Sequence, residues 1–182
     1  MEFRTIFAGF GGQGIVSMGI VLAHAGMEEG RHVTFYPSYG AAMRGGTANC
    51  SVIVSGSPIA SPIIAAPNML VAMNEPSLDF FISRLEPKGK LFVNSSLIKK
   101  KAGRADIAAH YVPANELAEK LGNGRMANMA MLGAVLAASQ MLPLARVQAA
   151  LEKTFAGKLQ KAIKPNQQAL QQGYEFMGNG GN

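Results

Sequence analysis

The residues best suited to chemistry in this sequence stand near its start, as Gly9-Phe10-Gly11-Gly12-Gln13-Gly14. The spacing is Gly-x-Gly-x-x-Gly, between a short apolar run and a longer helical one. In such a turn Gly9 permits a sharp bend, Gly11 lets backbone approach a ligand, and Gly14 lets the helix pack close to the strand. The free N–H groups at the helix start then face an anion, usually a pyrophosphate. The alternative is that the glycines only permit close packing.

A nicotinamide dinucleotide also needs an acidic residue at the end of the second strand, where it holds the ribose hydroxyls. Residues 34–38 (Thr-Phe-Tyr-Pro-Ser) contain none, and Glu28 and Glu29 precede that strand. NAD is therefore disfavoured. The Gln13 amide could bond either a ligand or neighbouring backbone.

A second candidate is the loop expected over residues 37–46, Pro-Ser-Tyr-Gly-Ala-Ala-Met-Arg-Gly-Gly. It follows a strand end, where open α/β sheets bind ligands, so it should lie near the glycine turn. Ser38 and Tyr39 supply hydroxyl groups. Arg44, beside Gly45, suits a guanidinium aimed at phosphate or carboxylate, the alternative being an ordinary surface arginine.

Asn128 is a polar amide in the otherwise apolar helix start 126–136. An amide in that setting either caps the helix or contacts something specific, and the sequence leaves both open.

No catalytic constellation or metal site is predicted. The three histidines lack ligand spacing, and there is no Ser-His-Asp or Cys-His arrangement and no carboxylate pair. A single cysteine, Cys50, can form neither an internal disulfide nor an iron–sulfur or zinc site, and its apolar setting predicts a buried, inert thiol.

Composition narrows the class of protein further. The 182 residues are 48% hydrophobic and 15% charged, which predicts a large core and a surface partly covered by a partner subunit. The formal charge of +6 raises nucleic acid, but the chain has no Trp and four Tyr, too few for base stacking. Lys99, Lys100, Lys101 and Arg104 are expected in a solvated loop, although an anionic ligand or acidic partner would explain the excess equally well. The start lacks a signal-peptide layout, and no apolar run is long enough for a membrane span, so a cytoplasmic location is expected.

The elements that must position these residues follow from periodicity and from the glycines and prolines. We expect strands at 3–8, 32–36, 47–54, 69–73, 90–94 and 107–112, with a short return strand at 59–60 antiparallel to 47–54. Helices are expected at 15–29, 76–85, 114–121, 126–140, 144–156 and 165–177. The first strand, helix and second strand should form a right-handed parallel crossover. The fold class is therefore α/β, a three-layer α/β/α sandwich with a mixed, mostly parallel sheet. It should be a single domain over 1–178, with a disordered tail at 179–182.

Several of these segments together resemble the gamma subunit, or gamma domain, of 2-oxoacid:ferredoxin oxidoreductases. They are Gly-Phe-Gly-Gly-Gln-Gly at 9–14, Tyr-Pro-Ser-Tyr-Gly from Tyr36, and Arg44-Gly-Gly with its following strand. Phe-Val-Asn-Ser-Ser-Leu from Phe92 and Arg-Met-Ala-Asn-Met-Ala-Met-Leu-Gly-Ala from Arg125 extend the likeness. It runs from about residue 3 to about residue 140, and the region after 143 is generic.

The resemblance implies a part of an enzyme that converts a 2-oxoacid and coenzyme A to acyl-CoA and CO₂ and reduces ferredoxin. It implies alpha and beta partner subunits, with a delta subunit in some complexes. Thiamine diphosphate and iron–sulfur clusters would sit on those partners, and the isolated chain would show no activity. The residues that it implies for coenzyme A binding are Gly9, Gly11, Gly12, Gln13, Gly14, Ser38, Tyr39, Arg44, Gly45 and Asn128. A free-standing Rossmann-like nucleotide-binding domain is the alternative, and a nucleic-acid module ranks last.

Overall fold

The computed structural model describes residues 2–39, 46–155 and 157–181. Its strands are β1 (Glu2–Phe10), β2 (His32–Tyr39), β3 (Thr47–Ser55), β4 (Met69–Ala72), β5 (Lys90–Asn94) and β6 (Ala108–Val112). Its α-helices are α1 (Ile15–Glu28), α2 (Glu75–Phe81), α3 (Ala114–Glu119), α4 (Ala127–Ser139), α5 (Leu144–Thr154) and α6 (Ile163–Gly178). Short 3₁₀ turns occupy Ile82–Arg84, Gly124–Met126 and Gly157–Ala162.

The strands form one mixed sheet in the order β2-β3-β1-β4-β5-β6. The pairings β1–β4, β4–β5 and β5–β6 are parallel, whereas β3 is antiparallel to both β1 and β2. β1 and β2 therefore run in the same direction, as the crossover requires, but β3 lies between them. This confirms the predicted mixed, mostly parallel sheet.

The predicted return strand at 59–60 is wrong, because those residues form no strand. Both edges of β3 are already paired, one with β1 and the other with β2. No edge of β3 is left for a further strand to pair with, so the chain after Ser55 crosses to β4 as a loop.

The second strand is longer than predicted, because residues 37–39 continue β2 instead of opening the loop. Pro37 lies opposite Cys50 of β3 in this extension. β2 is an edge strand, and an edge tolerates proline because the missing N–H can face away from the ladder.

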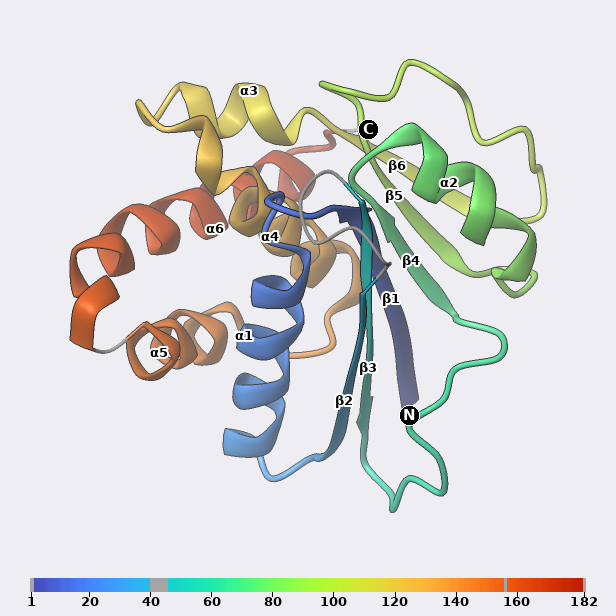
Figure 1. Ribbon diagram of the computed structural model, residues 1–182, viewed down its shortest axis with the longest axis horizontal. Helices are drawn as coiled ribbons and strands as arrows, with labels where there is room; N and C mark the ends of the chain where they lie inside the picture. Colours follow the sequence, from blue (N-terminus) through green and yellow to red (C-terminus); the bar gives the residue numbers. More distant parts are fainter. Residues whose placement is uncertain (1, 40–45, 156, 182) are drawn as a thin grey trace.

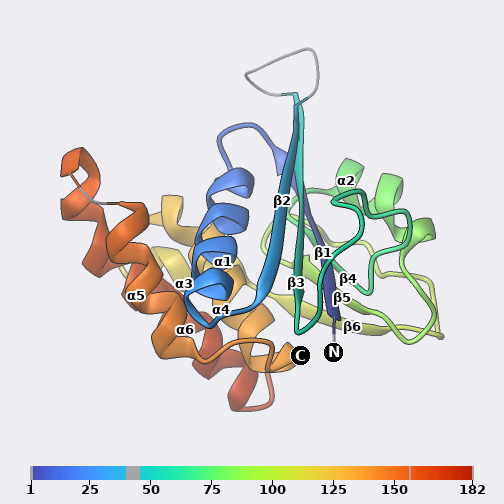
Figure 2. The same ribbon diagram turned by 90° about the horizontal axis from the view of Figure 1, so that it is seen from below.

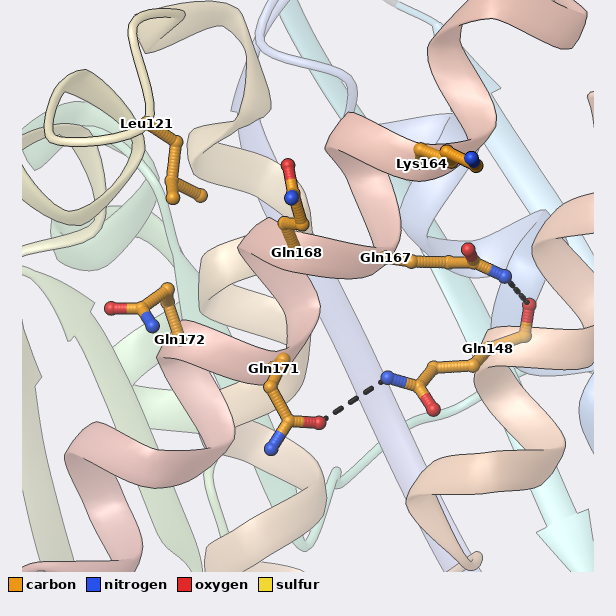
Figure 3. A pocket seen from close by; sticks show the side chains of 7 residues that line it. All are labelled: Leu121, Gln148, Lys164, Gln167, Gln168, Gln171 and Gln172. Carbon is orange, nitrogen blue, oxygen red and sulfur yellow. Dashed lines mark hydrogen bonds between the residues drawn. The ribbon is translucent and has the colours of Figure 1, made fainter.

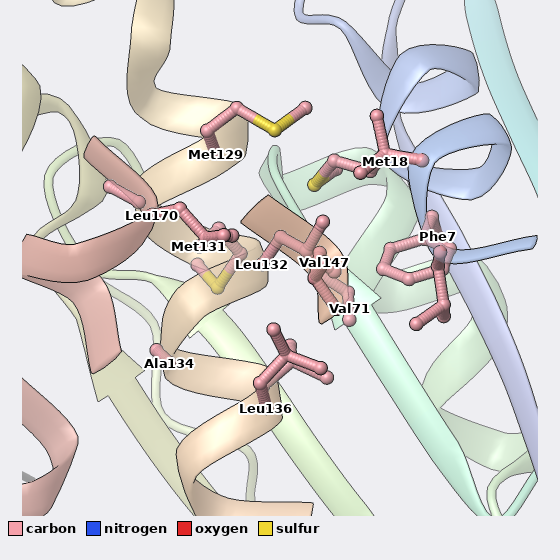
Figure 4. Packing of buried hydrophobic residues seen from close by; sticks show 14 of the residues in the cluster. Phe7, Met18, Val71, Met129, Met131, Leu132, Ala134, Leu136, Val147 and Leu170 are labelled. Atoms are coloured by element: carbon pink, nitrogen blue, oxygen red, sulfur yellow. The ribbon is translucent and has the colours of Figure 1, made fainter. Parts of the chain in front are cut away.

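Helices cover both faces of the sheet, which confirms the three-layer sandwich. Figures 1 and 2 show α2 alone on one face and α1 with α3–α6 on the other. The two cores follow the alternation of side chains along each strand: Phe7 belongs to the cluster under α1 and α4 (Figure 4), whereas its neighbour Ile6 belongs to the cluster under α2. Strands covered on both faces read as continuous apolar runs, as β4 does.

The helix α4 is buried along most of its length, since residues 127–136 are all buried. Its closest neighbour is α6, and the two backbones nearly touch at two glycines. A Cβ on Gly133 would overlap the carbonyl oxygen of Leu170, and one on Gly173 would overlap that of Ala130. The apolar faces of α4 are thus covered within the chain, so this helix gives no support to the predicted partner subunit.

Gly181 caps α6, since its N–H donates to the Phe176 carbonyl at 2.9 Å. The disorder predicted for 179–182 stays a prediction, and Asn182 lies outside the described residues. Among the helices described, none combines the length and the apolar character needed to cross a lipid bilayer.

Candidate functional site

The glycine turn lies at the edge of the sheet where the parallel strands end. From β1 the chain turns to α1 on one face, and from β4 it turns to α2 on the opposite face (Figure 2). In open α/β sheets this change of direction marks the place where ligands bind. The topology thus puts the turn where the sequence predicted a binding site.

Gly9 is buried as the second-last residue of β1, so the bend begins after it and not at it. A Cβ at this position would lie 2.6 Å from both Gln13 Oε1 and Ile15 Cδ1, and 3.0 Å from Met73 Cβ. Its role is therefore close packing instead of the predicted sharp bend. Side chains already fill the space above it.

The Gln13 side chain bonds backbone at two points. Its Oε1 accepts from the Phe10 N–H at 2.7 Å, and its Nε2 donates to the Met73 carbonyl at 3.1 Å. The sequence left open whether the Gln13 amide bonds a ligand or neighbouring backbone. In the structure both of its polar atoms bond backbone groups.

Gly14 is the N-cap of α1 and has a φ of 72°, a left-handed conformation that suits glycine. The Asn128 Nδ2 donates to its carbonyl at 3.3 Å, and a Cβ on Gly14 would overlap that amide. Gly14 therefore makes room for α4, not for the strand as predicted. Asn128 does not cap α4, which has no side-chain cap, so its specific contact is the glycine turn itself.

The end of the second loop meets the turn, because the Gly11 N–H donates to the Gly46 carbonyl at 2.9 Å. The Gly11 N–H is therefore already bonded within the protein and is not available to a ligand. Arg44 and Gly45 lie outside the described residues, and Tyr39 is the last residue of β2.

Ser38 is exposed on β2 opposite Asn49, which lies opposite Ala8 of β1. Two strand spacings, roughly 9–10 Å, therefore separate Ser38 from β1. The structure does not bring Ser38 to the turn.

Exposed Gly12 and the uncapped first turn of α1 are the parts of the turn that could bind a ligand. Gly12 is exposed, with a φ of 98° and no described atom within 4 Å of the place of a Cβ. The first turn of α1 carries no side-chain cap and no acidic residue. Its backbone N–H groups lack helical partners and carry the positive end of the helix dipole. The site can bind an anion through main-chain groups, and its described part offers no acid or base to a reaction.

Other potential sites are occupied by structural contacts. His24 Nδ1 lies 2.9 Å from Thr154 Oγ1, and His110 stacks on Phe92 with ring centroids 5.0 Å apart. Within the described ranges, no three His, Cys, Asp or Glu residues gather closely enough to hold a metal ion. The Lys99–Lys101 loop is exposed, and Lys100 pairs with Asp79 at 2.6 Å.

Burial raises the pKa of the Cys50 thiol to about 12 from its ordinary 9.0, although a backbone hydrogen bond with Gly19 opposes the shift. Because the buried thiol stays protonated more readily than the exposed one, its contribution to the free energy of unfolding is fully present below pH 9.0. This contribution is lost as the pH rises toward about 12. Between about pH 8 and about pH 10.5, urea unfolding should show the wild type losing about 2 kcal/mol more than Cys50→Ala. Equal losses in the two proteins would contradict the burial of the thiol.

Two hollows among the described residues lie away from the turn, beside α6. One of about 390 Å³ is lined by glutamines of α5 and α6, with Leu121 and Lys164 (Figure 3). Gln148 Nε2 donates to Gln171 Oε1 at 3.3 Å, and Gln167 Nε2 donates to the Gln148 carbonyl at 3.1 Å. These glutamines therefore hold α5 against α6, a role that the generic C-terminal sequence did not indicate.

Sequence reasoning also missed two backbone groups of the site, the carbonyls of Met73 and Gly46. They hold Gln13 and Gly11 in place. No sequence signal could have revealed them, because every residue type carries a carbonyl.

Comparisons with known proteins point in one direction. Residues 4–176 match the family model described as pyruvate ferredoxin/flavodoxin oxidoreductase. Ketoisovalerate oxidoreductase subunit VorA of Methanothermobacter thermautotrophicus is 42% identical over 176 residues, which cover 96% of this chain and 36% of that one. The pyruvate/ketoisovalerate oxidoreductases common subunit gamma of Thermococcus kodakarensis is 30% identical over 176 residues, which cover 90% of this chain and 93% of that one.

Among solved structures, the 2-oxoglutarate:ferredoxin oxidoreductase from Magnetococcus marinus, with 2-oxoglutarate, coenzyme A and succinyl-CoA bound, superimposes with a TM-score of 0.86. The match covers 98% of this chain and 31% of that one at 20% sequence identity, so it shows the fold alone. The chain spans about a third of the length of both this protein and VorA.

Proposed function

We propose, for a chain that belongs to the pyruvate ferredoxin/flavodoxin oxidoreductase family, that it is the gamma-type part of a 2-oxoacid:ferredoxin oxidoreductase. The complex converts a 2-oxoacid and coenzyme A to acyl-CoA and CO₂ and reduces ferredoxin. The common subunit gamma of Thermococcus kodakarensis, matched over 93% of its length, supports the gamma-type assignment. The relatives' names include ketoisovalerate, pyruvate and 2-oxoglutarate, so the proposal stays at the class of 2-oxoacids.

Within this complex the chain contributes to coenzyme A binding through the glycine turn. The observation that carries this role is the exposed main chain at Gly12, beside a first turn of α1 that has neither a side-chain cap nor an acidic residue. Coenzyme A carries phosphate groups, and such a helix start favours them. The bound coenzyme A of the Magnetococcus marinus enzyme supports the same ligand. Ser38 and Tyr39 at the end of β2, with Arg44 and Gly45 beyond it, remain proposed contacts, Ser38 with a part of coenzyme A away from the turn.

The reactive groups belong to other polypeptides in this proposal. Thiamine diphosphate, which supplies the decarboxylation chemistry, and iron–sulfur clusters sit on alpha, beta or delta subunits. The chain has one cysteine, and it is buried, so it offers no set of thiolates to a cluster. Its own task is to bind and orient the acyl acceptor. The isolated chain is expected to be inactive, and the complex to be cytoplasmic and to bind neither nucleic acid nor membrane.

A free-standing dinucleotide-binding domain fits the turn less well. In that family of sites the backbone near the first glycines approaches the pyrophosphate directly. Here Gln13 and Ile15 fill the space above Gly9, and the Gly11 N–H is bonded to Gly46. The opening that remains suits a terminal anionic group better than a dinucleotide laid across the turn.

Replacement of Gly12 tests the coenzyme A role, since its side-chain position is open. Asp and Asn at this position have the same shape and the same backbone strain, so their difference isolates charge. We expect the assembled complex with Gly12→Asp to bind coenzyme A about tenfold more weakly than the complex with Gly12→Asn, because the carboxylate repels phosphate. Isothermal titration calorimetry measures both affinities, and equal values would reject the role of the turn.

A further inference from the structure

We infer that Gln13 is a positioning residue, whose side chain holds the glycine turn in the shape that presents Gly12 and the start of α1 to an anion. The inference deepens the proposed function and rests on it, because the anion is the phosphate of coenzyme A. Gln13 then acts on coenzyme A through the shape of the turn and not by direct contact.

Three hydrogen bonds of Gln13 close the turn. Its backbone N–H donates to the Phe10 carbonyl at 3.1 Å, while its Oε1 accepts from the Phe10 N–H at 2.7 Å. Its Nε2 reaches across to the neighbouring strand and donates to the Met73 carbonyl at 3.1 Å. One side chain therefore joins the end of β1 to the residue that follows β4.

The position demands a glutamine for a chemical reason. The side chain must accept from one backbone group and donate to another, which a single amide does and a carboxylate or an ammonium does not. Gly9 is also needed for this arrangement, because a Cβ there would lie 2.6 Å from Gln13 Oε1. The absence of a side chain at Gly9 leaves room for the Gln13 amide to reach its two partners.

The two hydrogen bonds of the Gln13 side chain, to Phe10 and Met73, form a brace that fixes the exposed residue of the turn, Gly12. Gly12 lies between Gly11, held by the Gly46 carbonyl, and Gln13, held by Phe10 and Met73. With both neighbours fixed, Gly12 keeps its φ of 98°, and no described atom lies within 4 Å of the place of a Cβ. Without the brace the turn would sample other shapes, and coenzyme A would have to select the binding shape at the expense of affinity.

The test uses the assembled complex with Gln13→Met. This substitution keeps the approximate size of the side chain and removes the two hydrogen bonds of its amide to Phe10 and Met73. Gln168→Met is the matched control, because Gln168 is exposed on α6 beside the glutamine-lined hollow. We expect the KM for coenzyme A to rise roughly tenfold in Gln13→Met, as the loss of two hydrogen bonds implies. The kcat at saturating coenzyme A and the KM for the 2-oxoacid should stay within about twofold, and the control should match the wild type.

An unchanged KM for coenzyme A, or a fall in kcat alone, would overturn the inference. If Gln13→Met fails to assemble, Gln13→Asn serves instead, since its amide stays neutral but is one methylene too short to bond both Phe10 and Met73. A raised KM for coenzyme A in that variant supports the brace, and an unchanged one overturns it.

Hydrogen exchange separates this inference from the proposed function. In the wild-type complex, coenzyme A should slow exchange in a peptide covering residues 9–16, and Gln13→Met should speed that exchange before coenzyme A is added. Lack of protection in the wild type rejects the proposed function and the inference with it. Protection in the wild type together with unchanged exchange in ligand-free Gln13→Met rejects the inference alone.

Discussion

Replacing Gly173 by alanine is expected to destabilise the fold by about 3 kcal/mol, because α4 and α6 cross with no room for a methyl group. The new Cβ would overlap the Ala130 carbonyl oxygen and lie 2.6 Å from its carbon. These are backbone atoms of a buried helix and cannot turn aside as a side chain would. The cost of overpacking therefore exceeds its usual range and reaches about 4 kcal/mol, against a gain of about 1 kcal/mol in helix propensity.

The same crossing makes Gly133→Ala an independent replicate, since its Cβ would overlap the Leu170 carbonyl and lie 2.8 Å from the Tyr174 nitrogen. Gly178→Ala is the matched control at the end of α6, where nothing lies within 4 Å of the added methyl group. Urea unfolding followed by circular dichroism should show a loss in the first two variants and a small gain in the control. A Gly173→Ala variant as stable as the wild type would show that the helices do not cross this closely.

Gly14→Ala is expected to cost about 3 kcal/mol and to disable the anion site in the same step. The φ of 72° disfavours alanine by about 1–2 kcal/mol, and the methyl group would overlap the Asn128 amide. Relief of that overlap moves either α4 or the start of α1, whose N–H groups form the proposed site. The expected functional result is a complex that assembles but needs much more coenzyme A for half-maximal rate.

A double-mutant cycle with Asn128→Ala separates the two causes. Asn128→Ala alone loses one hydrogen bond and should cost about 1 kcal/mol. In that background Gly14→Ala has no amide to meet, so its own cost should fall to the backbone term of about 1–2 kcal/mol. Strictly additive free energies of unfolding would mean that the methyl group and the amide never compete.

Local pattern was sufficient for most elements of this protein. The apolar runs at β4 and β5 and the helical period of α5 need only neighbours in the chain, and glycine or proline stands beside many boundaries, as Gly30 and Pro143 do. The glycine turn was placed correctly for the same reason, since strand, turn and helix follow one another directly. Pro37 misled the prediction for β2, because its effect depends on whether the strand lies at an edge of the sheet.

Local sequence pattern could not predict where β3 pairs or which groups the site residues bond. Gln13 meets a carbonyl 60 residues away, and Asn128 meets one 114 residues away. A strand such as β3 pairs with whichever edge the rest of the fold leaves open, and here that space lies between β1 and β2.

Residue types and spacing were therefore enough to establish the α/β class and to locate the glycine turn that we propose binds an anion, because both depend on short stretches of chain. The roles within the turn depended on the folded chain. Gly9, Gly14, Gln13 and Asn128 serve packing and bracing, and Gly12 with the start of α1 stays open. The physical reason is that a polar group's partner is set by which surfaces meet in space, and such meetings carry no periodic signal along the sequence.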